Sequence, residues 1–468
     1  MNIITRFPPS PTGLIHVGTA KTALLNYLFA KKHNGKVILR WEDTDRARSK
    51  KEYEQNIFET LEWLGLTFNE VHHQSERTLI YQKHIGKLIA EGKAYFSEES
   101  TVINAREGSE EEDDDEVKVV SNEKRVIRFK NPNKVITFTD LLRGDISVDT
   151  TELGDFVIAR TIEEPLYHLA VVIDDFEMGI THIIRGEDGI YNTPRQILIQ
   201  EALGAPRPTY CHFPFILGAD RSKLSKRNGS IPVSEYKNMG ILPDAFINYL
   251  ALLGWNPGTT QEIFTREELI EAFSLERIQK SGAIFDLEKL LWFNREHIKR
   301  MPDQEFKKQV LSFLPEQFKA LPQWSDERLT KALSDIKERI STLKDVAELA
   351  ESGDFTYFFA TPTFTLEALI PKAKKGESIT LDTVATHLQK VIVLLDPLSE
   401  TSWNKEAVKG ALWDYATEVG RAEVLWPLRF LLSGRDKSPD PFTLSEILGK
   451  QETLTRIKST LSLISPKA

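Results

Sequence analysis

The sequence of 468 residues lacks most of the features that would place a protein outside a reducing, aqueous compartment. It contains one cysteine, Cys211, which excludes both an intrachain disulfide and a zinc site built from four cysteines. No apolar run approaches the ~18 residues that a membrane-spanning helix requires, and the first residues show no signal-peptide pattern. These absences favour a cytoplasmic protein that has no membrane segment.

An excess of positive charge is also absent, since the formal net charge is −9. Residues 306–468 hold as many basic as acidic side chains, so the whole negative balance belongs to the first 305 residues. Much of it comes from the run 107–116 (EGSEEEDDDE), which we interpret as a solvated loop. Local basic patches elsewhere can still hold a phosphate backbone, so net charge does not exclude a nucleic-acid partner.

The length indicates several domains, and the first of them has an α/β pattern. Residues 2–7 predict a strand, helical spacing of apolar residues begins at Thr19, and residues 37–41 predict a second strand. A strand, a helix and a strand at this spacing are typical of a βαβ unit in a parallel sheet.

Two later apolar segments, 169–173 and 182–185, predict further strands that resume this sheet. The residues between, roughly 86–165, therefore look like an insertion into a split nucleotide-binding fold. Residues 246–253, 266–273 and 286–292 show helical spacing, and from about residue 306 onward the pattern predicts helices and no strand.

Two short segments carry the clearest chemistry. In the first, Arg6 to Thr19, a histidine and a glycine (His16 and Gly18) lie where a strand turns into a helix, and a helix N-terminus can hold phosphate oxygens. The second, KLSKR at residues 223–227, places Lys223 and Lys226 on a loop near a glycine. Mobile ammonium groups can neutralise charge that develops on a leaving pyrophosphate, so the pair indicates a site for a nucleoside triphosphate.

The two segments resemble the HIGH and KMSKS signatures of class I aminoacyl-tRNA synthetases. The surrounding words narrow the resemblance to the bacterial-type glutamyl-tRNA synthetases, and it extends through nearly the whole chain. Each word alone is weakly specific, but all occur here in the family's order: PSPTG at 9–13, WEDTDR at 41–46, IRGED at 184–188 and KLSKR at 223–227.

The resemblance implies an α/β fold with a split Rossmann-type catalytic domain and an inserted acceptor-binding domain, followed by an all-helical C-terminal half. The expected catalytic domain comprises residues 1–85 and 166–235, and the inserted acceptor-end-binding domain comprises residues 86–165. Residues 236–305 would form a stem-contact domain, and residues 306–468 the helical anticodon-binding region. The cysteine-based zinc motif that many relatives carry in the insertion is absent, so no metal ligands are expected.

The implied reaction is the ATP-dependent attachment of L-glutamate to tRNA(Glu) through a glutamyl-adenylate, with Mg²⁺ on the phosphates. His16, Lys223 and Lys226 are the expected catalytic residues, and His16, Gly18 and Lys226 are expected to bind ATP. Arginine suits recognition of a second carboxylate, because its planar fork bonds a carboxylate bidentately and stays charged. The residues expected to bind glutamate are Arg6, Ser10, Glu42, Tyr167 and Arg185, although Arg185 has an alternative role in a salt bridge to Glu187 or Asp188.

The contacts with tRNA are less visible in the sequence. Arg339 precedes a short word resembling the family's anticodon-reading segment, and Arg435 and Lys437 lie in a segment resembling its C-terminal end. An exposed helix arginine is the alternative role for Arg339. The resemblance further implies that tRNA is needed before the amino acid is activated, and a monomer is expected.

Four other functions compete with this interpretation. Glutaminyl-tRNA synthetases typically read PEPNG where this chain has PSPTG, lack an arginine at position 185 and carry a β-barrel C-terminal half. A small-molecule nucleotidyltransferase, or the truncated relative that glutamylates a modified tRNA base, leaves the helical tail unexplained. A non-catalytic helical binding module leaves His16 and Lys226 unexplained.

Overall fold

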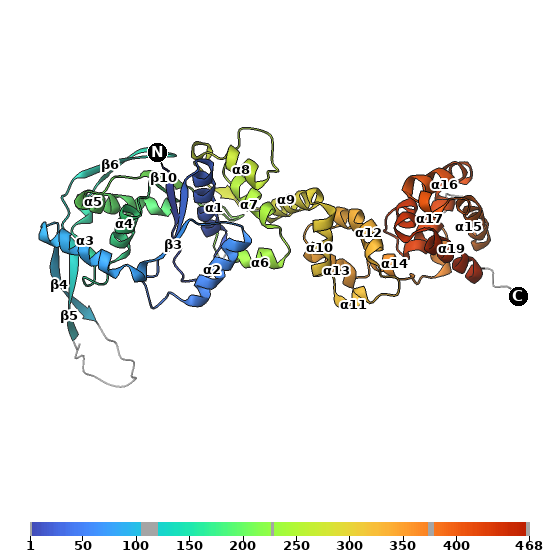
Figure 1. Ribbon diagram of the computed structural model, residues 1–468, viewed down its shortest axis with the longest axis horizontal. Coiled ribbons are helices and arrows are strands. Elements are labelled where there is room, and N and C mark those ends of the chain that lie inside the picture. Colours follow the sequence, from blue (N-terminus) through green and yellow to red (C-terminus); the bar gives the residue numbers. More distant parts are fainter. Residues whose placement is uncertain (1, 104–119, 226–228, 373–378, 465–468) are drawn as a thin grey trace, which may run out of the picture. The chain divides into compact units, whose positions relative to one another are not determined.

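The computed structural model describes residues 2–103, 120–225, 229–372 and 379–464, and the chain divides into two compact units (Figure 1). One unit comprises residues 1–238 and 243–293, and the other comprises residues 239–242 and 294–468. The acidic run 107–116 and Lys226 lie outside the described residues. The four expected domain boundaries stay predictions.

The first unit is α/β, with strands and helices alternating through most of its length. Its helices and strands between residues 4 and 159 are β1 (Ile4–Phe7), α1 (Val17–Lys32), β2 (Lys36–Trp41), α2 (Lys51–Trp63), β3 (Glu70–His73), α3 (Thr78–Ala90), β4 (Ala94–Ile103), β5 (Val120–Phe129), β6 (Val135–Asp140), β7 (Gly144–Asp149) and β8 (Phe156–Ala159). The remainder are α4 (Tyr167–Glu177), β9 (His182–Gly186), the 3₁₀ helix η3 (Glu187–Asn192), α5 (Thr193–Leu203), β10 (Thr209–Phe213), β11 (Ile216–Leu217), α6 (Val233–Asn238), α7 (Pro243–Leu252), α8 (Arg266–Ala272), β12 (Ala283–Ile284) and α9 (Leu287–Arg300), the last of which continues into the second unit.

Two mainly parallel sheets form the framework of this unit. Strands β1, β2 and β3 pair in parallel, and β10 pairs in parallel with both β9 and β6. The two sheets meet where the backbone N–H of Thr181 donates to the carbonyl of Ile4. The hairpin of β6 and β7, which belongs to the expected insertion, therefore extends the sheet of β9 and β10 rather than standing apart from it.

The prediction of a strand at residues 169–173 is wrong, because these residues lie in α4. The run Leu169 to Ile173 is buried on every side, and a short continuous apolar run fits a buried helix as well as a buried strand. Helix α4 packs with α3 and α5 in a core that also includes Ile38, Ile183 and Tyr210 from the strands. This core places the first turn of α4 next to the carboxyl ends of β1 and β9.

The described residues of the second unit form helices, as the pattern from residue 306 predicts. They are α10 (Asp303–Phe313), α11 (Glu316–Lys319), α12 (Asp326–Arg339), α13 (Lys344–Glu351), α14 (Thr356–Phe359), α15 (Leu381–Leu395), α16 (Lys405–Val419), α17 (Arg421–Ser433), α18 (Pro441–Leu448) and α19 (Lys450–Ile464). Within the described ranges of the whole chain, no helix has the length and apolar character that crossing a bilayer would need.

Candidate active site

A cavity of about 750 Å³ opens at the carboxyl ends of β1, β9 and β10. This is the sheet edge at which open α/β folds bind their ligands. Every described residue that the sequence assigns to ATP or to glutamate lines this cavity: Arg6, Ser10, His16, Gly18, Glu42, Tyr167, Arg185 and Lys223. Their convergence fits a single site, and their individual roles stay predictions.

His16 and Gly18 lie where the loop after β1 becomes helix α1. His16 is the N-cap residue of α1, with an extended backbone and an exposed imidazole whose Nε2 lies 3.3 Å from Thr19 Oγ1. No acidic side chain occupies the first turn of α1. The first turn therefore adds no negative charge of its own that would compete with a phosphate group at this helix N-terminus. A Cβ at Gly18 would lie 3.4 Å from two atoms of the His16 ring, so glycine leaves that ring its space.

Lys223 reaches the cavity from the loop after β11. Its ammonium lies 3.8 Å from the centre of the Phe215 ring and 3.7 Å from Asp188 Oδ2, and the side chain is more than half exposed. Both contacts are the weak, solvent-screened kind that a bound phosphate could replace. Lys226, the second expected catalytic lysine, lies outside the described residues.

Arg6 is the third residue of β1 and is only 2% exposed. Its Nε donates to Asp175 Oδ1 at 3.2 Å, and Arg40 Nη1 donates to the same oxygen at 2.7 Å. Burial alone would raise the pKa of Asp175, but the two guanidinium groups lower it overall. Arg6 Nη1 is buried, lies in a residue that lines the cavity, and has no hydrogen-bond partner among the described residues.

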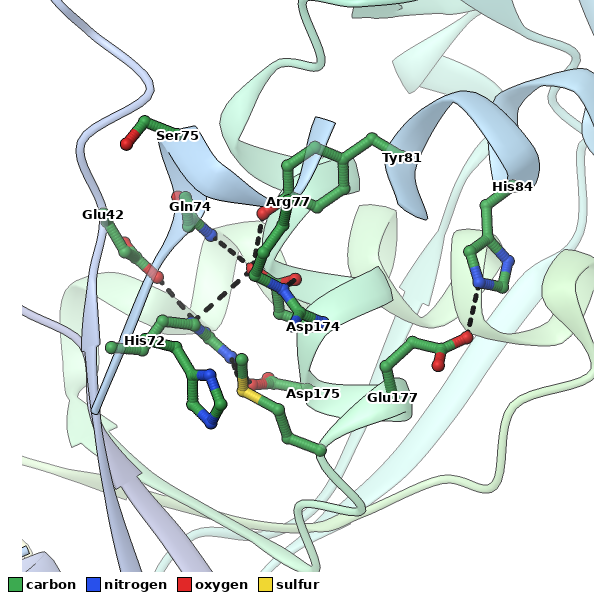
Figure 2. A network of polar contacts seen from close by, with 12 residues as sticks. Glu42, His72, Gln74, Ser75, Arg77, Tyr81, His84, Asp174, Asp175 and Glu177 are labelled. Atoms are coloured by element: carbon green, nitrogen blue, oxygen red, sulfur yellow. Dashed lines mark hydrogen bonds and ion pairs between the residues drawn. The ribbon is translucent and has the colours of Figure 1, made fainter. Parts of the chain in front are cut away.

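A second buried carboxylate, Asp174, fixes the outer side of this network (Figure 2). Its Oδ1 accepts from Arg77 Nε at 2.7 Å, while its Oδ2 accepts from Tyr81 at 2.9 Å and from Gln74 at 2.9 Å. Arg40 Nε lies 3.9 Å from the same Oδ2 and thereby joins the Asp174 and Asp175 sets. The adjacent acids of α4 thus tie β1, β2 and the start of α3 together beneath the cavity.

Glu42 follows β2 and is 9% exposed. Arg40 Nη2 donates to its Oε1 at 3.3 Å. Burial raises the pKa of Glu42 to about 7, against the opposing effect of Arg40 and Arg6. Because burial disfavours the charged form of Glu42, a nearby cation would stabilise its carboxylate. Glu42 therefore suits the ammonium group of an amino acid.

Arg185, at the end of β9, is held by neutral groups only. Its Nε donates to His212 Nε2 at 3.0 Å, and its Nη2 donates to the Gly189 carbonyl at 3.0 Å, to Thr193 Oγ1 at 2.8 Å and to Gln196 Oε1 at 2.8 Å. Burial lowers the pKa of this guanidinium, and its Nη1 has no partner among the described residues. The structure therefore leaves a buried positive charge at the cavity wall without a carboxylate beside it.

The alternative role of Arg185 in a salt bridge is wrong for the described residues. Glu187 pairs with Arg143, and Asp188 pairs with Lys223 at 3.7 Å, so neither acid forms an ion pair with Arg185. The two acids that follow Arg185 in the sequence therefore pair with cations from other parts of the chain. A local spacing of charges could not reveal this, because a tight 3₁₀ helix follows β9 at once.

Ser10 and Tyr167 complete the expected glutamate set. Ser10 is exposed on the loop after β1, and Tyr167 is the first residue of α4, with 42% of its surface exposed. Both line the cavity, and neither side chain makes a hydrogen bond to another residue of the described ranges. Both hydroxyl groups can therefore turn toward a ligand without breaking a hydrogen bond within the protein.

Several residues that shape the cavity were not predicted from the sequence. Asp174 and Asp175 end an apolar run that was interpreted as a strand, so their burial was not foreseen. Asp140 and His212 support Arg185 from strands that are distant in sequence. The one available signal was two consecutive acids directly after an apolar run, which is unusual for a solvent-facing pair.

The expected tRNA contacts of the second unit are partly engaged within the protein. Arg339, the last residue of α12, donates to the Asp354 carbonyl and to the Tyr357 hydroxyl, both at 3.1 Å. Arg435 donates to the Ser352 carbonyl at 2.9 Å. The structure thus brings both arginines to the loop 352–354, while Lys437 is exposed nearby in sequence. Arg339 is half-buried, so it is not the simple exposed helix arginine of the alternative interpretation.

Comparisons with known proteins agree with this arrangement. The family model described as "tRNA synthetases class I (E and Q), catalytic domain" matches residues 2–292, and one described as "Anticodon binding domain" matches residues 305–461. The glutamate–tRNA ligase of Thermodesulfovibrio yellowstonii is 41% identical over 97% of this chain and 98% of its own length. That of Carboxydothermus hydrogenoformans is 40% identical, with the same coverage. A crystal structure of a glutamate tRNA ligase from Elizabethkingia meningosepticum, in complex with its amino acid, superposes with a TM-score of 0.80 at 30% identity, covering 99% of this chain and 100% of that one.

Proposed function

This chain belongs to the class I tRNA synthetases of the E and Q type, and we propose that it attaches L-glutamate to tRNA(Glu) in an ATP-dependent reaction. The relatives that it matches over almost their whole length are named glutamate–tRNA ligases, and its C-terminal half matches an anticodon-binding domain. The reaction passes through a glutamyl-adenylate.

The observation that carries the choice of glutamate is the pair of arginines. Arg6 and Arg185 are buried, line one cavity, and each leave Nη1 without a hydrogen-bond partner among the described residues. A buried guanidinium group needs an anion, and a carboxylate can bond both nitrogens of its fork. Glu42 in the same cavity supplies the complementary negative charge for the ammonium group. A neutral side-chain amide would leave the charge on Arg185 unpaired, so the site rejects glutamine.

The ATP end of the cavity positions charge rather than forming a covalent bond to the protein. The α-carboxylate of glutamate attacks the α-phosphorus of ATP, the bond to pyrophosphate breaks, and glutamyl-adenylate forms. His16 and the N-terminus of α1 hold phosphate oxygens, and Lys223 and Lys226 stabilise the negative charge that develops on the leaving pyrophosphate. A hydroxyl of the terminal ribose of tRNA then attacks the carbonyl carbon, and AMP leaves.

Mg²⁺ belongs to this proposal as a companion of the triphosphate. Among the described residues, no group of three or more His, Cys, Asp or Glu side chains is arranged to hold a metal ion. Mg²⁺ that accompanies a nucleotide is usually held by the phosphates with one or two carboxylates, so ATP would supply most of its ligands, and no step assigned to the protein depends on a resident metal.

The helical half supplies the grip on tRNA(Glu). Arg339, Arg435 and Lys437 are the proposed contacts, and the two arginines already converge on the loop 352–354. The enzyme is proposed to act as a monomer in the cytoplasm.

The test is charging of purified tRNA(Glu) and tRNA(Gln) with labelled glutamate and with labelled glutamine. Glutamate should be attached to tRNA(Glu), and glutamine should be attached to neither tRNA. ATP–pyrophosphate exchange with glutamate should be negligible alone and should appear when tRNA is added, because the bound acceptor end completes the ATP pocket. Equal use of glutamine, or full exchange without tRNA, would contradict the proposal.

A further inference from the structure

The support of Arg185 differs from that of Arg6, although both are offered to the same carboxylate. Arg6 makes a direct ion pair with Asp175. Arg185 instead contacts an imidazole, a backbone carbonyl, a hydroxyl and an amide, and no described carboxylate lies within ion-pair distance of it. Its orientation is therefore fixed without its charge being neutralised.

The imidazole in this set, that of His212, is itself held by a buried carboxylate. His212 on β10 is 0% exposed, and its Nδ1 lies 2.8 Å from Oδ2 of Asp140, which is the last residue of β6 and 1% exposed. Because the Arg185 Nε–H can only donate, His212 Nε2 must carry a lone pair. The proton of the neutral ring therefore lies on Nδ1 and is donated to Asp140.

The surroundings keep His212 in this neutral form. Burial lowers its pKa, the Arg185 and Arg143 guanidinium groups lower it further, and Asp140 acts in the opposite direction. Asp140 is fixed independently of the imidazole, because its Oδ1 accepts the backbone N–H groups of Leu142 and Arg143 at 3.0 and 3.1 Å. Its Oδ2 also accepts the backbone N–H of His212 at 2.9 Å.

We propose that Asp140 and His212 are positioning residues that set the specificity for an acidic amino acid by holding Arg185 in one orientation while leaving its charge to the substrate. The inference rests on the proposed function, since it assigns the substrate carboxylate to Arg185. A carboxylate placed directly on Arg185 would compete with the substrate for the guanidinium. An imidazole between the two passes on the orientation set by Asp140 but adds no opposing charge to Arg185.

The substitution Asp140→Asn tests the direction of this chain of hydrogen bonds. An asparagine can keep the contacts with Leu142 and Arg143 through its oxygen. Its NH₂ group then faces both the backbone N–H and the ring Nδ1 of His212, so the contact with that backbone N–H is lost as well. The imidazole must accept from that group at Nδ1, so its proton moves to Nε2, where it opposes the Arg185 N–H. We expect the KM for glutamate to rise by ~10-fold or more, about 1.4 kcal/mol, with the KM for ATP unchanged. The ratio of kcat/KM for glutamate to that for glutamine should fall by the same order.

A pair of His212 variants separates orientation from simple packing. In His212→Gln the amide oxygen can reach the place of Nε2 and accept from Arg185, whereas in His212→Asn the shorter amide reaches only the place of Nδ1. The His212→Gln variant should retain most of the wild-type affinity for glutamate, measured by calorimetry, and the His212→Asn variant should lose it. Asp145→Asn is the matched control, because Asp145 is an exposed acid on the neighbouring strand β7 that bonds Thr139.

Nitrogen NMR of the full chain with labelled histidine supplies a readout that packing alone would not move. In the wild-type enzyme, the His212 signal, assigned by its loss in His212→Gln, should be that of the Nδ1–H tautomer. In Asp140→Asn it should become that of the Nε2–H tautomer. The inference is overturned if the wild-type ring is Nε2–H or doubly protonated, or if an inverted ring leaves glutamate binding and discrimination intact. If Asp140→Asn fails to fold, equal losses in the two His212 variants overturn it. Charging by the wild-type enzyme tests the proposed function separately.

Discussion

Replacement of Arg185 by cysteine tests the assignment of the substrate carboxylate most directly. Arg185 is 9% exposed, and its buried Nη1 has no partner among the described residues, so in the proposed complex this nitrogen meets the substrate carboxylate out of contact with water. Loss of one member of such a buried, hydrogen-bonded charge pair costs about 2–5 kcal/mol. Because each ~1.4 kcal/mol is a factor of ten, kcat/KM for glutamate should fall by ~30-fold to ~5,000-fold.

The change in kcat/KM for glutamine in the same variant decides how the loss for glutamate is interpreted. Glutamine gains nothing from the charge on Arg185, so its kcat/KM should change far less and the discrimination between the two amino acids should narrow. The assay is charging of tRNA at subsaturating amino acid, with folding of the variant checked by thermal unfolding. Arg207→Cys is a matched control, because Arg207 pairs with Glu201 at the surface and an exposed pair contributes at most about 1 kcal/mol. The reasoning is refuted if glutamate and glutamine lose activity by the same factor, or if glutamate kinetics do not change.

Three further predictions concern the other parts of the proposed mechanism. Lys226→Ala should lower the single-turnover rate of adenylate formation by ~10²-fold or more with little change in glutamate affinity, and a variant of near wild-type rate would remove Lys226 from the mechanism. Since the pKa of Glu42 is raised to about 7, its carboxylate is lost as the pH falls below that value. The pH profile of kcat/KM for glutamate should therefore rise through about pH 7, and Glu42→Gln should abolish this limb rather than shift it. Arg339→Gln should leave charging of tRNA(Glu) largely intact while admitting tRNA(Gln), a change of about 1–3 kcal/mol measurable with purified tRNAs, and unchanged selectivity would oppose a base contact.

The sequence predicted those parts of the fold that depend on local signals. The βαβ unit at the N-terminus and the helical second half follow from the spacing of apolar residues, and both are confirmed. The run at residues 169–173 was assigned to the wrong element, because its apolar residues are continuous and show neither period. A helix that is buried on several sides has no polar face, and it is the alternation of a polar and an apolar face that identifies a helix in a sequence.

The candidate site was predicted as a set of residues but not as a set of contacts. His16, Gly18 and Lys223 could be found because they occur in short motifs. The partners of the arginines could not, since Asp175 is 169 residues from Arg6 in the chain. No local pattern links residues at that separation, and only the packing of α4 against β1 brings them together.

The separation of those charges has a consequence for synthesis of the chain. Arg6 and Arg40 emerge from the ribosome early, but the acid that neutralises both lies 169 and 135 residues further on. At translation rates of ~5–20 residues per second, Arg6 waits roughly 8 to 34 s for Asp175. Until then, burial would leave the Arg6 guanidinium group without its ion-pair partner, whereas Arg40 already has the nearby carboxylate of Glu42. We therefore expect the burial of Arg6 in β1 to be completed only after α4, which carries Asp175, has been synthesised.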